Sequence, residues 1–377
     1  MKRKEASSIL LKNQAYCLGE KNSIESKTIL IDLERAMSIE FRKIRSQVRL
    51  LNPFKGHTPD EIPFEIRFDP LTGATGRVFD LPFRAEKPDI EDIVDRSRKI
   101  FCPFCPAALE KSTPEFPKDL IPEGRIRIGG ATLIPNLAPF EKHAGVAIFS
   151  PEHFLPMENL TPETMRNAFS ASLVYLKRVA QIDPLVSFFS INWNYMPCAG
   201  SSIVHAHLQP NAGEVPTNAL REQIEGCRRY REENGRNFWH DFIDEEKQKE
   251  ERYLQTIGSS FWAMSFVPAA FLPDLQCVFP ERLTLMELSE EDLEFFLEGL
   301  SRTLKYFLEK NLYSFNVSIF STREEKNHRV NARICPRLFP RPIGNSDIAY
   351  PQMMHKESFT VRPPEAVRNE LLPFFTP

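Results

Sequence analysis

The segment SSIVHAHLQP, residues 201–210, concentrates side chains that could do chemistry. Successive side chains of a β-strand point to opposite faces, so in a strand His205, His207 and Gln209 would all face the same way. Buried polar groups without a hydrogen-bond partner are costly, so something must satisfy these three. The histidine pair is therefore either part of a buried hydrogen-bond network or in contact with a metal or a substrate.

A second reactive group is CPFC, which contains Cys102 and Cys105. Two thiolates at this spacing can hold one Zn²⁺ ion, which needs two more ligands for a tetrahedral site. His153 and His205 are the candidates, because both lie near the ends of predicted strands. A redox pair should open a helix, and a proline after each cysteine makes that a poor start. Zinc binding is thus favoured, with a pair of buried thiols as the plain alternative.

If His205 holds the metal, His207 is free to react. A neutral imidazole with a pKa near its ordinary value of about 6.5 is a competent nucleophile at neutral pH, and phosphorus is a suitable target. Gln209 would donate to phosphoryl oxygens, and Ser202 and Asn194 lie just upstream as further donors. Without CPFC and His153, a structural histidine pair would be the better interpretation. The sequence contains neither a P-loop nor a dinucleotide-binding glycine motif, and no nicotinamide or flavin is expected.

The elements that must position these groups follow from hydrophobic spacing and turn residues. A helix is expected across 33–48. A second helix is expected to begin with Thr161 as N-cap and Pro162 at its first position. Residues 217–255 predict a mostly exposed helical connection, interrupted near Gly235. Strands are expected in a hairpin formed by FEIRF and GRVFDL, at 125–128, 131–134 and 144–150, and in VSFFSINWN.

The second half of the chain repeats the first. The order of LTPETMRNAFSASLVYLKRV, LVSFFSINW and VHAHLQP returns as LSEEDLEFFLEGLSRTLKYFL, YSFNVSIF and VNARICP, with Ser289 as the second N-cap. The histidines have become Asn331 and Arg333 in the second copy. We therefore expect an α+β fold of two tandem repeats, each an antiparallel sheet with packed helices, in which one half catalyses and the other is mainly scaffold.

Length, composition and charge limit the classes of partner, the location and the division of the chain that can be expected. The chain has 377 residues, 42% hydrophobic content and a formal net charge of −3, which disfavours a nucleic-acid partner. No stretch approaches the ~20 apolar residues of a membrane helix, and the first residues do not resemble a signal peptide, so a cytoplasmic protein is expected. The expected divisions are an N-terminal extension (1–58), a first repeat with the zinc site and the nucleophile (59–257) and a degenerate second repeat (258–377).

CPFC, FSPEHF and AGSSIVHAHLQ, in this order, resemble the galactose-1-phosphate uridylyltransferases, a two-repeat branch of the histidine-triad superfamily. RFDPLTG and FRAEKP upstream, and FWAMSFVPAAF, PRLFPRP and AYPQMMHKES downstream, fall in the same family order. The likeness covers roughly residues 64–365 and identifies the chain as a divergent member. It implies that both repeats are histidine-triad-like.

The resemblance implies a double displacement. His207 would attack the α-phosphorus of a nucleotide sugar, release sugar 1-phosphate and form a nucleotidyl-histidine, which a hexose 1-phosphate or inorganic phosphate would then discharge. The implied activity is that of a hexose-1-phosphate uridylyltransferase, with a nucleoside-diphosphate-sugar phosphorylase or a dinucleoside-tetraphosphate phosphorylase as related alternatives. A non-catalytic, zinc-stabilised nucleotide-binding protein is the alternative of another class.

The same matching assigns roles to further residues. Gln209 would assist His207, while Arg84, Lys87, Asn194 and Ser202 would contact phosphates. Asn136 would lie near the nucleoside. One structural zinc ion per chain, held by the four ligands named above, and a homodimer whose second subunit completes the sugar site are also implied.

Several positions depart from the family pattern. Ala206 replaces the usual proline between the histidines, and Leu137 replaces an acidic residue that would recognise ribose. Pro351 and Glu357 stand where a glutamate and a glutamine would read the hexose, so an unusual sugar is expected. The second repeat lacks its metal histidines although Glu222 matches that site's glutamate, so no second metal is expected.

Overall fold

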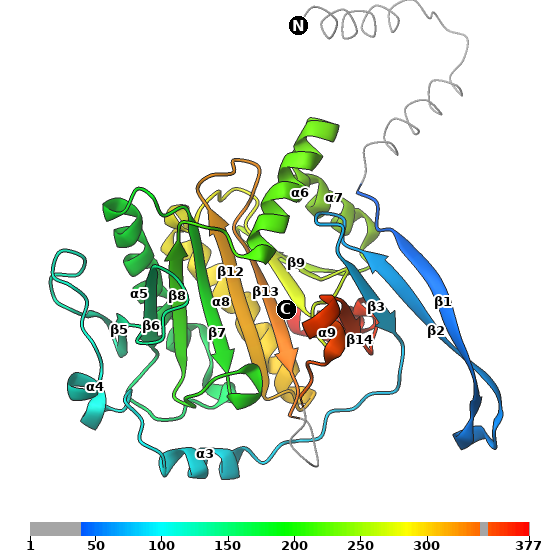
Figure 1. Cartoon of the computed structure of the whole chain (residues 1–377), viewed down its shortest axis with the longest axis horizontal. Helices are drawn as coiled ribbons and strands as arrows, with labels where there is room; N and C mark the ends of the chain where they lie inside the picture. The colour runs from blue at the N-terminus through cyan, green and yellow to red at the C-terminus, as the bar shows by residue number, and fades with distance from the viewer. Residues whose placement is uncertain (1–38, 340–345, 377) are drawn as a thin grey trace, which may run out of the picture. The chain divides into compact units, whose positions relative to one another are not determined.

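A ten-stranded antiparallel sheet dominates the fold, with long helices packed on one of its faces (Figure 1). The computed structural model describes residues 39–339 and 346–376. The strand order is β4 (Ile126–Ile128), β5 (Ala131–Pro135), β6 (His143–Ile148), β8 (His207–Gly213), β7 (Phe188–Tyr195), β12 (Ser314–Thr322), β13 (Asn331–Arg337), β11 (Leu275–Val278), β10 (Ser260–Met264) and β9 (Tyr253–Ile257).

The strand order reveals the predicted duplication. β7 and β12 lie at the centre and pair antiparallel, and each is followed outward by the corresponding strands of its own half. The prediction of two tandem repeats, each an antiparallel sheet with packed helices, is confirmed. The two five-stranded halves are joined into one sheet, with Ile191 opposite Ile319 at the junction.

The two long helices begin where the sequence places capping residues. α5 (Pro162–Ile182) has Thr161 as N-cap and a proline in its first turn, as predicted. α8 (Glu290–Glu309) has Ser289 as N-cap, whose hydroxyl accepts from the amide of Asp292 while the Asp292 carboxylate accepts from the amide of Ser289. Both capping boxes satisfy amides that a helix end would otherwise leave unpaired.

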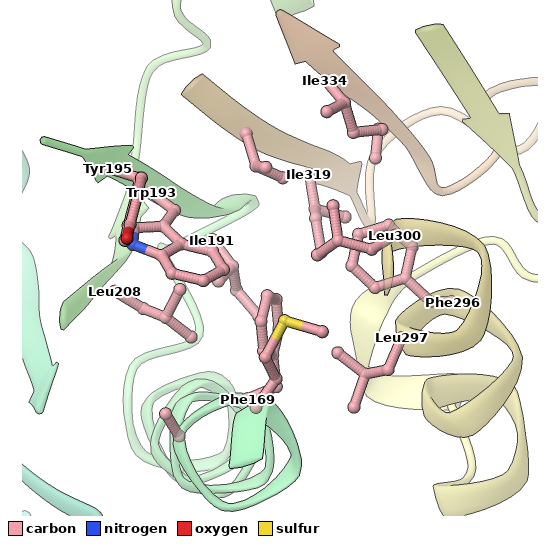
Figure 2. Close-up of a cluster of buried hydrophobic side chains, with 14 of the residues drawn as sticks. Phe169, Ile191, Trp193, Tyr195, Leu208, Phe296, Leu297, Leu300, Ile319 and Ile334 are labelled. Atoms are coloured by element: carbon pink, nitrogen blue, oxygen red, sulfur yellow. The ribbon is translucent and has the colours of Figure 1, made fainter. Parts of the chain in front are cut away.

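The main core lies between these helices and the sheet and is shared by both repeats. Figure 2 shows Phe169 of α5 beside Phe296 of α8, with ring centroids 5.8 Å apart. Ile191 and Trp193 from β7 and Ile319 from β12 point into the same cluster. Because odd-numbered residues of β7 and β12 fill this core, their even-numbered residues project from the opposite side, which we call the open face.

A smaller sheet of order β1-β2-β3-β14 carries the N-terminal described segment. β1 (Lys43–Asn52) and β2 (Thr58–Phe68) form a long hairpin, and β3 (Thr75–Phe79) and β14 (Ser358–Thr360) complete the sheet. The predicted hairpin from FEIRF to GRVFDL is confirmed in β2 and β3. The helix predicted across 33–48 is wrong over residues 39–48, which are extended or irregular, because cross-strand pairing of β1 with β2 outweighs local helical preference. Residues 33–38 lie outside the described residues.

The remaining helices cover edges and connections. The connection after β8 is helical as predicted, and Gly235, with a φ of +73°, ends its first helix. No helix in the described part of the chain is long and apolar enough to cross a membrane. The helices other than α5 and α8 are α3 (Ile90–Arg98), α4 (Pro106–Ser112), α6 (Asn218–Asn234), α7 (Phe238–Lys249), α9 (Tyr350–His355) and α10 (Pro364–Phe375). Single helical turns lie at Pro53–Lys55, Met157–Asn159, Pro197–Ala199 and Leu285–Glu287.

Replacing Gly299 by alanine should destabilise the protein. A Cβ at this position of α8 would lie 2.2 Å from the ring of buried Trp262, so the helix would have to move away from β10. We expect a loss of about 1–3 kcal/mol in the free energy of unfolding, measured by urea denaturation. Glu298→Ala, one residue away and outside this contact, is the control and should stay within about 0.5 kcal/mol of the wild type. Equal stability of both variants would contradict the close packing of α8.

Candidate functional site

Polar side chains line the open face where the central strands meet. Gln209 of β8 lies opposite Asn192 of β7, and two residues further in the same register His207 falls opposite Asn194. On the other side of β7, Asn194 pairs with Asn316 of β12. The two repeats therefore contribute to one continuous polar strip.

The four predicted metal ligands come together at one end of this strip. The ligand atoms of Cys102, Cys105, His153 and His205 all lie within 4.8 Å of one another. Nδ1 of His153 is 3.3 Å from Sγ of Cys105, and Nδ1 of His205 is 3.7 Å from Sγ of Cys102. The cluster could therefore bind a metal ion.

Hydrogen bonds orient both histidines of the cluster for ligation. Nε2 of His205 donates to the carbonyl oxygen of Ser150 at 2.8 Å, because a carbonyl can only accept. The Ser97 hydroxyl donates to Val94 O at 2.6 Å, so it accepts the Nε2 proton of His153 at 3.0 Å. Each ring thus directs a bare Nδ1 toward the thiols, the arrangement typical of metal-binding histidines.

The electrostatics of the cluster fit a cation. Burial and the neighbouring Cys102 thiol raise the pKa of Cys105 to about 11, so this thiol is protonated at neutral pH without a compensating charge. Burial lowers the pKa of His153 and of His205, which keeps both imidazoles neutral as ligands require. A divalent cation would hold both sulfurs as thiolates, so two sulfur and two nitrogen donors fit zinc.

His207 is the first residue of β8 and is only 6% exposed. Its Nδ1 donates to the carbonyl oxygen of His205 at 2.8 Å, which leaves Nε2 with a free lone pair. Burial lowers the pKa of His207, so the ring is neutral. This is the state in which an imidazole is nucleophilic. The expectation that His205 lies in the same strand is wrong, because β8 begins only at His207.

The predicted phosphate-contacting residues nearest to His207 are available for a ligand. The side chains of Gln209 and Ser202 have no hydrogen-bond partner among the described residues. Asn194 accepts at Oδ1 from Nδ2 of Asn316, at 2.7 Å, and its own Nδ2 makes no bond within residues 39–339 and 346–376. Donors from two neighbouring strands and one loop are therefore free along this part of the strip.

A hydrogen-bond relay from the second repeat fixes the orientation of Asn194. Arg337 donates to Oδ1 of Asn316 at 2.8 Å, and Asn316 in turn donates to Asn194. Arg337 is itself held in an ion pair with Asp347. The sequence did not single out Asn316 or Arg337; their position one strand beyond the first repeat becomes visible only with the pairing of β7 and β12.

An apolar cluster lies beside His207. Buried Phe104, Ile134, Val146 and Ile148 pack together, and the Phe104 ring is 5.2 Å from that of His207, edge to face. Asn136 follows β5 directly; its backbone amide donates to the carbonyl of Ala144, and its side-chain Oδ1 accepts from the amide of Ala138 at 2.9 Å. The predicted nucleoside-contacting residue is therefore two positions from the apolar cluster.

Arg84 and Lys87 are not brought to His207 within this chain. Arg84 lines a different cavity of about 420 Å³, together with Tyr306 of α8, Lys310 just after that helix and residues of α10. That cavity is on the helical side of the sheet, and Lys87 is exposed in the segment before α3. Their contact with phosphate remains a prediction.

The second repeat has the corresponding positions but different chemistry. Arg333, which occupies the place of His207, is held by Asp274 at 3.2 Å. Asn331, in the place of His205, donates to Oε1 of Gln223 at 3.0 Å, and His328 contacts the same oxygen. Internal pairs thus satisfy both positions.

Comparisons with known proteins agree with this architecture. The chain is 31% identical over 335 residues to an uncharacterized protein of Archaeoglobus fulgidus, covering 88% of this chain and 98% of that protein. No family model matches the sequence.

Solved structures share the fold at lower identity. A GalT-like protein of Arabidopsis thaliana superposes with a TM-score of 0.62 at 18% identity, covering 81% of this chain and 98% of the other. An ADP-glucose phosphorylase of Arabidopsis thaliana, with bound ADP-glucose, gives 0.63 at 17% identity and covers 82% and 98%. A uridylyltransferase gives 0.59 at 17%, with coverage of 82% and 98%.

The protonation of His207 is directly testable. We expect long-range ¹H–¹⁵N correlation spectra at neutral pH to show His207 as a neutral ring with the proton on Nδ1, because the His205 carbonyl holds that proton. A His207→Gln variant assigns the signal, and His240, which is partly exposed on α7, serves as a reference ring. A proton on Nε2 of His207 would contradict the geometry described above.

Proposed function

This chain belongs to one family with the Archaeoglobus fulgidus protein and shares its fold with GalT-like proteins. From that premise we propose that it is a divergent member of the galactose-1-phosphate uridylyltransferase-like branch of the histidine-triad superfamily, and a nucleotidyltransferase acting on nucleotide sugars. His207 is the nucleophile in this proposal, and Gln209 assists it.

The observation that carries the proposal is the free Nε2 of a neutral, oriented His207 at the start of a strip of unpaired donors. A merely structural histidine in a buried position would use both ring nitrogens in hydrogen bonds. Here one nitrogen is bonded to backbone and the other is available for reaction.

The reaction proceeds in two displacements. Nε2 of His207 attacks the α-phosphorus, a P–N bond forms, and the bond from phosphorus to the bridging oxygen breaks, so that sugar 1-phosphate leaves with the electron pair. The Nδ1 proton stays on the ring, hydrogen-bonded to the His205 carbonyl, which stabilises the positive charge of the adduct. An oxygen of a second phosphate then attacks phosphorus and the P–N bond breaks, restoring the neutral imidazole.

The surrounding groups supply binding and charge stabilisation. The amide of Gln209, the free Nδ2 of Asn194 and the hydroxyl of Ser202 would donate to phosphoryl oxygens as charge develops there. The apolar cluster around Phe104 would accept the nucleobase, with Asn136 at its edge. A homodimer is part of this proposal: Arg84 and Lys87, which lie away from His207 in their own chain, would contact the phosphates of the neighbouring subunit.

Zinc would bind to Cys102, Cys105, His153 and His205. The ion would supply a structural cross-link, tying the CPFC segment and the end of β6 to the residues that precede β8. His207 depends on this cross-link, since its Nδ1 partner is the carbonyl of the ligand His205.

Related activities differ in the acceptor molecule that takes the nucleotidyl group from the histidine. A uridylyltransferase uses a hexose 1-phosphate, and a phosphorylase uses inorganic phosphate. A non-catalytic nucleotide-binding protein would have no need for the free Nε2 of His207. In our proposal residues 59–257 carry the reacting groups and 258–377 support them, with Asn316 as the clearest link.

An intact-mass measurement tests the mechanism. After mixing with UDP-, ADP- and GDP-sugars separately, the protein should gain the mass of one nucleoside monophosphate, because the P–N adduct accumulates when no acceptor is present. His207→Gly should abolish the adduct. His240→Ala, which removes a histidine far along the chain, is the matched control and should retain it.

An adduct that persists in His207→Gly would remove this residue from the mechanism. No adduct with any donor would favour the non-catalytic alternative.

Metal analysis tests the zinc site. The purified protein should contain about one zinc ion per chain, and Cys102→Ser should lose most of it, because two nitrogens and one sulfur form an incomplete site. Cys198→Ser changes a half-buried thiol outside the cluster and should keep the full metal content. Metal-free wild-type protein, prepared without chelators, would end the zinc proposal.

A further inference from the structure

A second pocket opens on the part of the sheet that belongs to the second repeat. Its volume is about 270 Å³, and Gln276 of β11 and Arg333 of β13 line it from the sheet side. The rest of its lining comes from the turn at 69–75, from α6 and α7, from residues 266–269, and from α9 and the segment that joins it to β14. Because Arg333 occupies the place that His207 has in the first repeat, the pocket lies at the second repeat's counterpart of that position.

A row of polar side chains crosses the open face from the proposed phosphate contacts to this pocket. Pairing of consecutive strands aligns Gln209, Asn192, Ser318, Arg333 and Gln276 in this order. Residues directly opposite each other on neighbouring strands share a face of the sheet, so all five project from the open face. Three strand spacings of about 4.8 Å, or roughly 14 Å, separate Gln209 from Arg333. A phosphate group bound at Arg333 would therefore be separate from one bound at Gln209.

The guanidinium of Arg333 is only partly used by the protein. Its Nε lies 3.2 Å from the carboxylate of Asp274, and its Nη2 donates to the carbonyl oxygen of Val267 at 3.1 Å. The Nη1 amino group makes no hydrogen bond within residues 39–339 and 346–376. Since the side chain is 26% exposed and lines the pocket, it has donors available to a ligand.

Three further side chains add free donors to the pocket. The side chain of Gln276 has no hydrogen-bond partner among the described residues. Oε1 of Gln223 accepts from Nδ2 of Asn331 at 3.0 Å, while Nε2 of Gln223 makes no bond to any described residue. Lys356 is exposed, and no ion pair engages its ammonium group in the part of the chain that the structure describes. A guanidinium, an ammonium and two amide groups are suited to phosphate oxygens.

The carboxylates of the pocket limit what else the ligand can be. Asp69 accepts from the amide and the hydroxyl of Thr72, at 2.8 and 3.0 Å. Glu357 is paired with Arg77. Among the described residues that line the pocket, Glu222 of α6 is the one carboxylate without a partner, and it is exposed. An anion alone leaves Glu222 unpaired, whereas a hydroxyl group of a larger ligand can donate to it.

We propose that this pocket is a non-catalytic binding site for a phosphate group, held by Arg333, Gln276 and Lys356. The phosphate belongs either to inorganic phosphate or to a phosphate monoester whose hydroxyl groups donate to Glu222. No covalent bond forms or breaks there. The second repeat then binds a ligand of its own in addition to supporting the first. The assignment concerns binding alone, so it does not rest on the proposed function.

Isothermal titration calorimetry with inorganic phosphate and with glycerol 3-phosphate tests the assignment. Lys356→Glu reverses the charge of an exposed side chain and should weaken the binding of both ligands about tenfold, as expected for the loss of a charge-assisted contact. Lys305→Glu makes the same change on the exposed side of α8, outside the pocket, and should stay within about twofold of the wild type. Because both positions are exposed, misfolding does not explain a difference between them.

Gln276→Leu tests the pocket from the sheet side. The substitution keeps the approximate size of the side chain and removes its donor, so the affinity for both ligands should fall about fivefold. Phosphate held only beside Gln209 would not respond to this change, because Gln276 lies four strands away.

Glu222→Ala distinguishes the two sources of the phosphate. About fivefold weaker binding of glycerol 3-phosphate, with no loss for inorganic phosphate, identifies a monoester as the ligand, because only its hydroxyl groups lose an acceptor. Unchanged or tighter binding of both identifies inorganic phosphate, because a repelling charge is removed without the loss of a contact.

The assignment and the proposed function fail separately. No binding of either ligand by the wild-type protein, or equal affinities of the wild type, Lys356→Glu and Gln276→Leu, would overturn the assignment of the pocket. Neither result affects the adduct at His207, and the absence of that adduct would leave phosphate binding in this pocket unchanged.

Discussion

The pairing of β7 with β12 is the interaction on which the rest of the structure depends. It joins the two repeats into one sheet. It also determines which residues of each central strand point into the core and which belong to the polar strip on the open face. A shift of one residue would turn the core side chains outward and remove Asn316 from Asn194. The shared cluster around Phe169 and Phe296 stabilises this register, because it is filled equally from both halves.

Local signals in the sequence were sufficient for much of this fold. Capping residues at Thr161 and Ser289 and the alternation in the central strands act over a few positions, so they could be recognised directly. The cluster of two cysteines and two histidines was recognisable because few residue types can form a group that could bind a metal ion. The strand at Lys43–Asn52 was missed because its conformation comes from pairing with β2, and Asn316 was missed because its role depends on a neighbour 122 residues away.

The second repeat fills the positions that correspond to His205 and His207 with residues that are paired within the chain. The carboxylate of Asp274 is fully buried and would be unfavourable alone, and Arg333, whose side chain is 26% exposed, offsets it. Removing the arginine would leave the Asp274 charge buried without its ion-pair partner, which is costly. Arg333 and Asn331 therefore make internal contacts at the positions where the first repeat has His207 and His205.

The carbonyl of His205 has a consequence for how this protein can evolve. One residue directs its ring to the cysteines and its backbone to the proton of His207. A substitution at position 205 that displaced the backbone would therefore change both the proposed metal site and the hydrogen bond that orients His207. In the second repeat, the corresponding positions hold Asn331 and Arg333, so both histidines are absent together there.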